Sequence, residues 1–214
     1  MLLTVTRSAD GFGSRRGGTA RGTGSVLAVA GLRSGCHYPS RMPELILPTV
    51  RLQAAFLECR DDWGPGLHED GFGLGAEDDV DSPEGFATWV HKRVRLTHPT
   101  GAACPDEPHG SPRWIVEDGV VLGGIALRHI VDDDIGQIGY GIRPCARRRG
   151  LAGWALREML AEARAVLGWD RVLVPCLADN VASARTIERN GGVLEGIRES
   201  EHGRVKRYWI ALNR

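Results

Sequence analysis

The second half of the chain alternates short apolar runs with amphipathic stretches, and this pattern predicts most of its elements. Two apolar runs are separated by Asp118-Gly119, a dipeptide typical of a tight β-hairpin. In the next run Gly139 and Gly141 alternate with larger apolar residues. A glycine inside a strand usually marks a bulge or a close approach by another group. We expect three antiparallel strands, at 113–117, 120–129 and 135–142.

A long helix should follow over about 152–166, because apolar residues recur there at helical spacing. The run 171–177 is apolar throughout and reads as a strand. A strand, a helix and a strand in succession predict a right-handed crossover and a parallel pair of strands. A shorter helix at 180–190 should end at Gly191-Gly192, and two last strands are expected at 193–200 and 204–212.

The first half of the folded region is less regular. A short strand is expected at 45–47, a helix at 48–63, and a second helix that begins at the capping residue Ser82 and runs to about 96. The connections 61–82 and 97–111 are rich in acids and in prolines, respectively, and should set the choice of acceptor. The acidic connection is either a solvated loop or a device that attracts a cationic substrate.

These elements predict a mixed α/β fold in which helices cover a sheet, formed by a single domain at 42–214. Residues 1–41 hold six arginines and one acid, and their pattern predicts no fold. Four interpretations of this tail stay open: a disordered segment, an over-extended start before Met42, a transit peptide or an export signal.

Composition narrows the class of protein. Because the net charge is zero overall, the region after the basic tail carries a charge of −5, which argues against a dedicated nucleic-acid binder. Five cysteines without a Cys-x-x-Cys pair predict neither a disulfide framework nor a metal site, and favour a reducing compartment, the cytoplasm. No apolar run is long enough to span a membrane.

The segment 143–153 carries the most specific chemistry. It holds four arginines and glycines at 150 and 153, and it lies between a predicted strand and a predicted helix. A helix start offers unpaired backbone N–H groups and the positive end of the helix dipole, so it favours an anion such as a polyphosphate. A solvated surface loop and a patch for nucleic-acid phosphates are the alternatives.

The order of these motifs resembles the GNAT superfamily of N-acetyltransferases. Arg147-Arg148-Arg149-Gly150-Leu151-Ala152 fits the family's turn Arg/Gln-x-x-Gly-x-Gly/Ala. Asn180-x-x-Ser183 with Ile187-Glu188-Arg189-Asn190-Gly191 fits the second segment, and the closing Arg207-Tyr208-Trp209-Ile210 is similar to a bacterial branch. The resemblance covers about 112–212, the expected core for acetyl-CoA, and more weakly 43–111.

The resemblance implies a mixed, mostly antiparallel sheet of about seven strands, with a parallel pair splayed at the coenzyme site and helices on both faces. It implies acetyl-CoA as co-substrate, with the turn's backbone amides on the pyrophosphate and the side chains of the three consecutive arginines partly interchangeable. Asn180 is either a contact of the pantetheine or a helix cap. The implied coenzyme-binding residues are Ile142, Arg143, Arg147, Arg148, Arg149, Gly150, Leu151, Ala152, Gly153, Asn180 and Ser183.

The family's activity is direct attack of a neutral amine on the thioester. His129 and Tyr140 are the candidates for the base. The alternative for His129 is an ordinary histidine at the end of a strand, and the alternative for Tyr140 is an aromatic residue of the core. The tyrosine that protonates the thiolate in many members is Ile187 here, so water or Tyr208 would have to replace it. We expect an N-acetyltransferase for a small-molecule or protein amine, with a non-catalytic acyl-CoA-binding module as the alternative and a homodimer left open.

Overall fold

The computed structural model describes residues 42–65, 71–97, 110–129, 136–200 and 203–212. The predictions for 1–41 lie outside these residues, as do most of 97–111 and part of 61–82. The helices are α1 (Gln53–Trp63), α2 (Pro83–Arg95), α3 (Leu151–Leu167) and α4 (Val181–Arg189). The strands are β1 (Glu44–Ile46), β2 (Gly110–Glu117), β3 (Val120–Arg128), β4 (Ile138–Ile142), β5 (Arg171–Leu177), β6 (Gly192–Ser200) and β7 (Gly203–Ala211).

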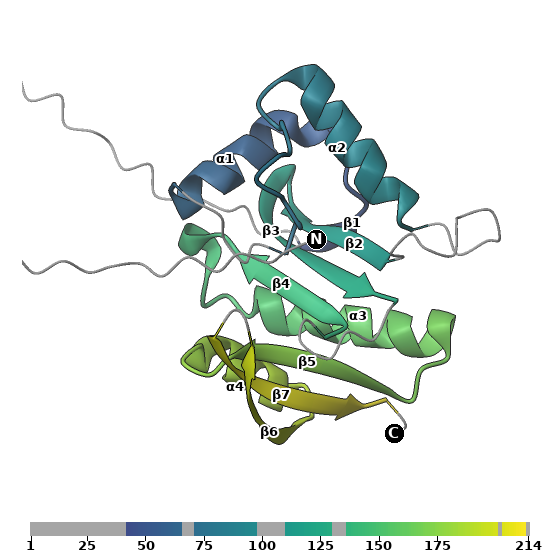
Figure 1. Ribbon diagram of the computed structural model, residues 1–214. Helices are drawn as coiled ribbons and strands as arrows, with labels where there is room; N and C mark the ends of the chain where they lie inside the picture. Colours follow the sequence, from purple (N-terminus) through teal and green to yellow (C-terminus); the bar gives the residue numbers. More distant parts are fainter. Residues whose placement is uncertain (1–41, 66–70, 98–109, 130–135, 201–202, 213–214) are drawn as a thin grey trace, which may run out of the picture.

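The strands form two antiparallel sheets, in the orders β1-β2-β3-β4 and β5-β7-β6. α1 and α2 lie over the first sheet, and α3 carries the chain from the end of β4 back to the start of β5 (Figure 1). The mixed α/β class and the antiparallel pairs are confirmed. Among the described residues, no helix is long and apolar enough to cross a membrane.

The expected parallel pair of β4 and β5 within one seven-stranded sheet is not confirmed, because the two strands belong to different sheets. A joint at Gln137 explains the difference. Its backbone N–H donates to Leu173 O at 2.9 Å, and its side-chain Oε1 accepts from the Leu173 N–H at 2.8 Å. The side-chain oxygen of Gln137 thus takes the place of the backbone carbonyl that would continue a ladder between the two strands. β4 and β5 then run in the same general direction without pairing (Figure 1).

Two cores form on opposite faces of the first sheet, because neighbouring residues of a strand point to opposite faces. Ile115 belongs to the aliphatic core that α3, α4 and the second sheet share. Trp114, the preceding residue, belongs to an aromatic core under α1 and α2. The aromatic residues of that core are Phe56, Phe72, Phe86, Trp89 and Trp114, with ring centroids 4.9–6.2 Å apart.

Glycines in β3 and β4 mark a close approach, as their pattern predicts. Gly124 lies opposite Gly141, and the backbone of Gly71 crosses this pair. A Cβ on Gly124 would lie 2.6 Å from a ring carbon of Phe72 and 2.8 Å from the carbonyl carbon of Gly71. The group that approaches the sheet here is therefore the segment before α2.

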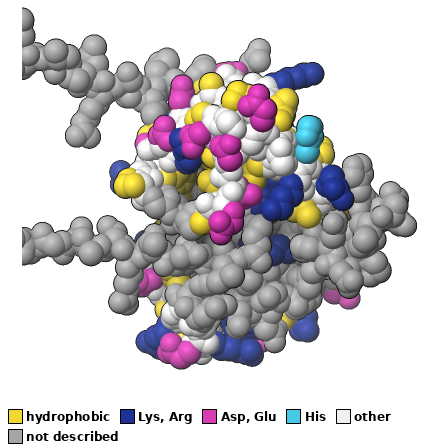
Figure 2. Space-filling view, turned by 45° about the horizontal axis from the view of Figure 1, so that its top comes forward, with side chains coloured by type: hydrophobic (Ala, Val, Ile, Leu, Met, Phe, Trp, Pro, Cys, Tyr) yellow, Lys and Arg dark blue, Asp and Glu magenta, His cyan; other side chains and the backbone are white. Residues whose placement is uncertain are grey.

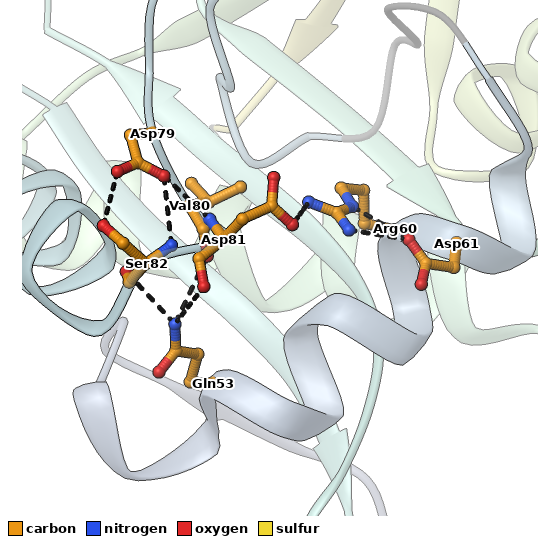
Figure 3. Close-up of polar contacts among 7 residues, drawn as sticks. All are labelled: Gln53, Arg60, Asp61, Asp79, Val80, Asp81 and Ser82. Atoms are coloured by element: carbon orange, nitrogen blue, oxygen red, sulfur yellow. Dashed lines mark hydrogen bonds and ion pairs between the residues drawn. The ribbon is translucent and has the colours of Figure 1, made fainter.

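The start of α2 is tied to α1 by side chains (Figure 3). Asp79 accepts hydrogen bonds from the hydroxyl and the N–H of Ser82, and the Ser82 hydroxyl caps the N–H of Gly85 at 3.0 Å. The side-chain amide of Gln53 donates to the carbonyls of 80, 81 and 82 at 3.3–3.4 Å. Arg60 joins Asp61 to Asp81 at 2.8 and 2.7 Å. These contacts hold 79–82 against α1.

Candidate coenzyme site

The start of α3 has the geometry of an anion site. Gly150 precedes the helix with a φ of 81°, and because glycine has no side chain, no side-chain oxygen caps the first helical amides. The first helical hydrogen bond runs from Trp154 N–H to Gly150 O at 3.0 Å, so the N–H groups of Leu151, Ala152 and Gly153 precede the helical ladder. A Cβ on Gly150 would meet nothing within 4 Å. These amides are open to an anion at the positive end of a 17-residue helix.

Arg143 and Arg149 are held by protein partners. The Arg143 side chain is 9% exposed, and its Nε donates to Asp62 Oδ2 at 3.1 Å. Its other nitrogens donate to the carbonyls of Glu58 at 3.2 Å and Val121 at 3.3 Å. Arg149 Nη2 donates to both oxygens of Glu117, at 3.0 and 2.7 Å, and that carboxylate is 3% exposed. Both guanidinium groups therefore fix the turn to the first sheet and α1.

Arg147 and Arg148 differ from these two and from each other. Arg147 Nε donates to Ile142 O at 3.0 Å, and its guanidinium carbon lies 4.8 Å from the ring centroid of Trp63. Arg148 is exposed and has a φ of 63°, in the left-handed region. The three consecutive arginines thus have different surroundings, which argues against the expected interchangeability of their side chains. Arg147 and Arg149 are exposed as well, but both contact other protein groups, so Arg148 best suits a direct phosphate contact.

Asp62, near the end of α1, reaches the turn from another part of the chain. Its Oδ2 accepts from Arg143 Nε and from the backbone N–H of Cys145, at 3.1 and 3.0 Å. Partial burial by itself would raise the pKa of Asp62, but the hydrogen bonds from Cys145 and Arg143 outweigh it, and the pKa is lowered. The carboxylate is therefore held ionised beside the turn.

Tyr140, Asn180 and Ser183 lie together where β4 meets the start of α4. The Tyr140 hydroxyl on β4 is 2.9 Å from Ser183 Oγ on α4. Asn180 Oδ1 accepts from the Ser183 N–H at 3.0 Å, so Asn180 caps α4, which is one of the two expected roles. The structure therefore brings three of the predicted residues into one cluster, between the strand that ends at the turn and the first turn of α4.

His129 is not brought to the start of α3. Gly123 pairs with Ile142, next to the turn, and His129 lies six residues further along the same strand direction, roughly 20 Å away. Its ring is 6.3 Å from that of Trp169, beyond the far end of α3. Its Nε2 is 3.4 Å from Ser111 Oγ. It also lies beyond the joint at Gln137, where β4 and β5 meet. These contacts match a strand-end histidine.

Tyr208 and Ile187 both belong to the aliphatic core. Tyr208 is 1% exposed, and its hydroxyl donates to Glu188 Oε1 at 3.0 Å. Burial, followed by this hydrogen bond and the charge of Glu188, raises the pKa of Tyr208 to about 12. Ile187, at the position of the family's tyrosine, is fully buried. Tyr208 is thus fixed to Glu188 rather than directed to the turn.

The acids of 61–82 are largely used for local structure. Asp62 binds Arg143, Asp79 accepts from the N–H of Ser82, the capping residue of α2, and Asp78 accepts from the N–H of Gly75 at 2.8 Å. Asp61 and Asp81 share Arg60. Figure 2 shows acidic side chains over this end of the molecule with lysines and arginines among them. Glu69 and Asp70 lie outside the described residues. The described part therefore favours a solvated, internally paired loop over electrostatic steering.

Sequence reasoning did not identify three residues that shape the turn, namely Asp62, Trp63 and Glu117. Asp62 stands in an acidic run and Glu117 precedes a hairpin, so neither has a local signal that marks its partner. Asp62 and Arg143 are 81 residues apart, and Glu117 and Arg149 are 32 apart.

Comparisons with known proteins agree with this geometry. A family model described as an acetyltransferase (GNAT) domain matches residues 72–193. No curated protein sequence matches the chain. Among solved structures, the microcin C7 self-immunity acetyltransferase MccE, in complex with acetyl-CoA and AMP, is 14% identical over 79% of this chain and 92% of its own, with a TM-score of 0.59.

Two ribosomal-protein acetyltransferases are similar in fold. RimL, the ribosomal L7/L12 α-N-protein acetyltransferase in complex with coenzyme A, is 18% identical over 80% of this chain and 95% of its own, with a TM-score of 0.61. The ribosomal-protein-S5-alanine acetyltransferase from Vibrio fischeri is 16% identical over 80% and 92%, with a TM-score of 0.59. At these identities the likeness shows the fold.

Proposed function

The chain belongs to the GNAT family of acetyltransferases, and from this premise we propose that it transfers the acetyl group of acetyl-CoA to a primary amine of a small molecule or a protein. The observation that carries the proposal is the helix start at Gly150, where no side chain caps the first amides and a Cβ on Gly150 would meet nothing within 4 Å. A pyrophosphate is the part of acetyl-CoA that such a site would hold. The complexes of MccE with acetyl-CoA and of RimL with coenzyme A support the same co-substrate.

The reaction needs no enzyme nucleophile. The amine nitrogen attacks the thioester carbonyl carbon, the carbon–sulfur bond breaks, the amine loses a proton and the leaving thiolate gains one. Tyr140 is our candidate for one of these proton transfers, because its hydroxyl on β4 lies beside the first turn of α4, 2.9 Å from Ser183 Oγ. The hydroxyl of Ser183 would keep the phenol in place and link it to solvent.

A non-catalytic acyl-CoA-binding module is the second candidate. The observation that favours it is Ile187, which is fully buried at the position where many family members carry a catalytic tyrosine. A nucleic-acid patch is less well supported, because the guanidinium groups of Arg143, Arg147 and Arg149 each donate a hydrogen bond to a protein oxygen.

Two measurements test the proposal. Isothermal titration with acetyl-CoA should give a dissociation constant in the micromolar range, and duplex DNA should not bind at the same salt concentration. Release of the free coenzyme A thiol should then be followed with a panel of polyamines, aminosugars, amino acids and peptides with a free N-terminus. Turnover with one class identifies the acceptor. Tight binding without turnover for any amine would support the binding module instead.

A further inference from the structure

The last turn of α1 contacts the segment 143–147 at both of its ends. At the first end, Asp62 Oδ2 accepts from Arg143 Nε and from the Cys145 N–H. At the second end, the guanidinium of Arg147 lies over the ring of Trp63. Between them lies the short 3₁₀ turn Pro144–Ala146, which leads from β4 toward the start of α3. A helix from the first half of the chain therefore holds the loop that offers the phosphate site.

The sequence of the turn explains why it needs an outside acceptor. Arg143 occupies the capping position of the 3₁₀ turn and makes no side-chain cap, since a guanidinium has no acceptor atom. Pro144 has no N–H, so the N–H of Cys145 is the first one in the turn, and it donates to Asp62. The carboxylate of Asp62 supplies the acceptor that a capping serine or aspartate would normally supply. The same oxygen also pairs with Arg143, whose side chain is 9% exposed.

We propose that Asp62 is a positioning residue for coenzyme binding, which acts through Arg143 and the Cys145 N–H on the backbone of 148–153. This inference rests on the proposed function, because it assigns the helix start to acetyl-CoA. Without the carboxylate, a buried guanidinium and a backbone N–H lose their shared acceptor, and the turn that orients the phosphate-binding amides relaxes. Asp62 does not touch the coenzyme in this scheme.

The sign of the effect separates positioning from simple electrostatics. Asp62 is a negative charge near a site for a polyanion, so its charge alone opposes coenzyme binding. If charge were its main influence, Asp62→Asn would strengthen binding. If Asp62 positions the turn, Asp62→Asn weakens acetyl-CoA binding by about 10- to 30-fold, because hydrogen bonds to a charged acceptor are among the stronger ones.

Asp61 provides a matched control. It is adjacent in sequence, carries the same charge, is 67% exposed and pairs with Arg60 rather than with the turn. Asp61→Asn should change the dissociation constant of acetyl-CoA by less than about twofold, because an exposed ion pair contributes little. Both variants are to be compared with the full wild-type chain by isothermal titration, and their thermal melting recorded by circular dichroism. Equal or tighter binding by Asp62→Asn would overturn the proposal, as would an equal loss in both variants.

Two further readouts exclude a general loss of structure. At saturating acetyl-CoA and with an amine from the panel, Asp62→Asn should keep kcat within about twofold of wild type while KM for acetyl-CoA rises. A parallel fall of kcat would refute positioning. If Asp62→Asn does not fold, Asp62→Glu keeps the charge but displaces the carboxylate by one methylene from Arg143 Nε and the Cys145 N–H, and it should weaken binding about threefold. Unchanged binding by that variant would count against the proposal. If wild type fails to bind acetyl-CoA, the proposed function fails first.

Discussion

Gly150→Glu tests the assignment of the phosphate site, because it should affect stability and coenzyme affinity very differently. Gly150 has a φ of 81°, and a residue with a side chain is strained there by roughly 1–2 kcal/mol. A Cβ would meet nothing within 4 Å, so there is no steric clash to add. A carboxylate at a helix N-terminus also gains about 0.3–1 kcal/mol from the dipole. The free energy of unfolding should therefore fall by only about 1 kcal/mol.

The loss of coenzyme affinity should be larger. A carboxylate at Gly150 would compete for the amides of Leu151 to Gly153 and would lie on the order of 6 Å from a bound phosphate, which at an effective dielectric constant of about 20 costs about 2–3 kcal/mol. This corresponds to a dissociation constant for acetyl-CoA raised by roughly 30- to 150-fold. Isothermal titration measures that change, and urea unfolding measures the change in stability.

Gly150→Gln is the control, since it has the same strain and nearly the same size but no charge. It should weaken binding by less than about tenfold, because Gln lacks the repulsion between the carboxylate and the phosphate and keeps only the effects of size and strain. If the Glu and Gln variants bind equally poorly, strain or bulk rather than charge dominates. If both bind as wild type does, the phosphate does not lie at the start of α3.

Three other predictions use different parts of the structure. Gly124→Ala should lower the free energy of unfolding in urea by about 1–3 kcal/mol, because its Cβ would lie 2.6 Å from Phe72. A Cβ on Gly196 would meet nothing within 4 Å, so Gly196→Ala should lower it much less, and equal losses of stability in the two variants would contradict this packing. Tyr140→Phe should lower kcat about 10- to 100-fold and leave the affinity for acetyl-CoA within about twofold, whereas an unchanged kcat would remove Tyr140 from the proton transfer. Because the folded-state pKa of Tyr208, about 12, is raised above the ordinary value of 10, the stability from its neutral phenol is complete below pH 10 and is lost as the pH rises toward 12. Tyr208→Phe should remove this loss of stability at alkaline pH, measured by unfolding between pH 9 and 12. An unaltered dependence of stability on pH would show that the Tyr208 phenol is not its source.

Most elements could be predicted from the sequence because their signals are local. The hairpin at Asp118-Gly119, the helix cap at Ser82 and the apolar stripe of α3 each depend on residues within one or two turns of chain. The candidate anion site at Gly150 is of the same kind, since a glycine with a positive φ directly before a helix is a property of a few consecutive residues. Local chemistry of this kind identified the turn and the expectation of a phosphate ligand.

Contacts between distant segments were decided only by the tertiary structure. The sequence presents four arginines as similar charges, but folding places Asp62 on one, Glu117 on another and Trp63 beside a third. The strand–helix–strand order predicted a parallel pair, but the side chain of Gln137 occupies the acceptor position that would continue the ladder. The sequence therefore determined where the candidate anion site lies along the chain. Packing across long sequence separations decided which side chains hold that turn in shape, because such partners leave no local periodicity to detect.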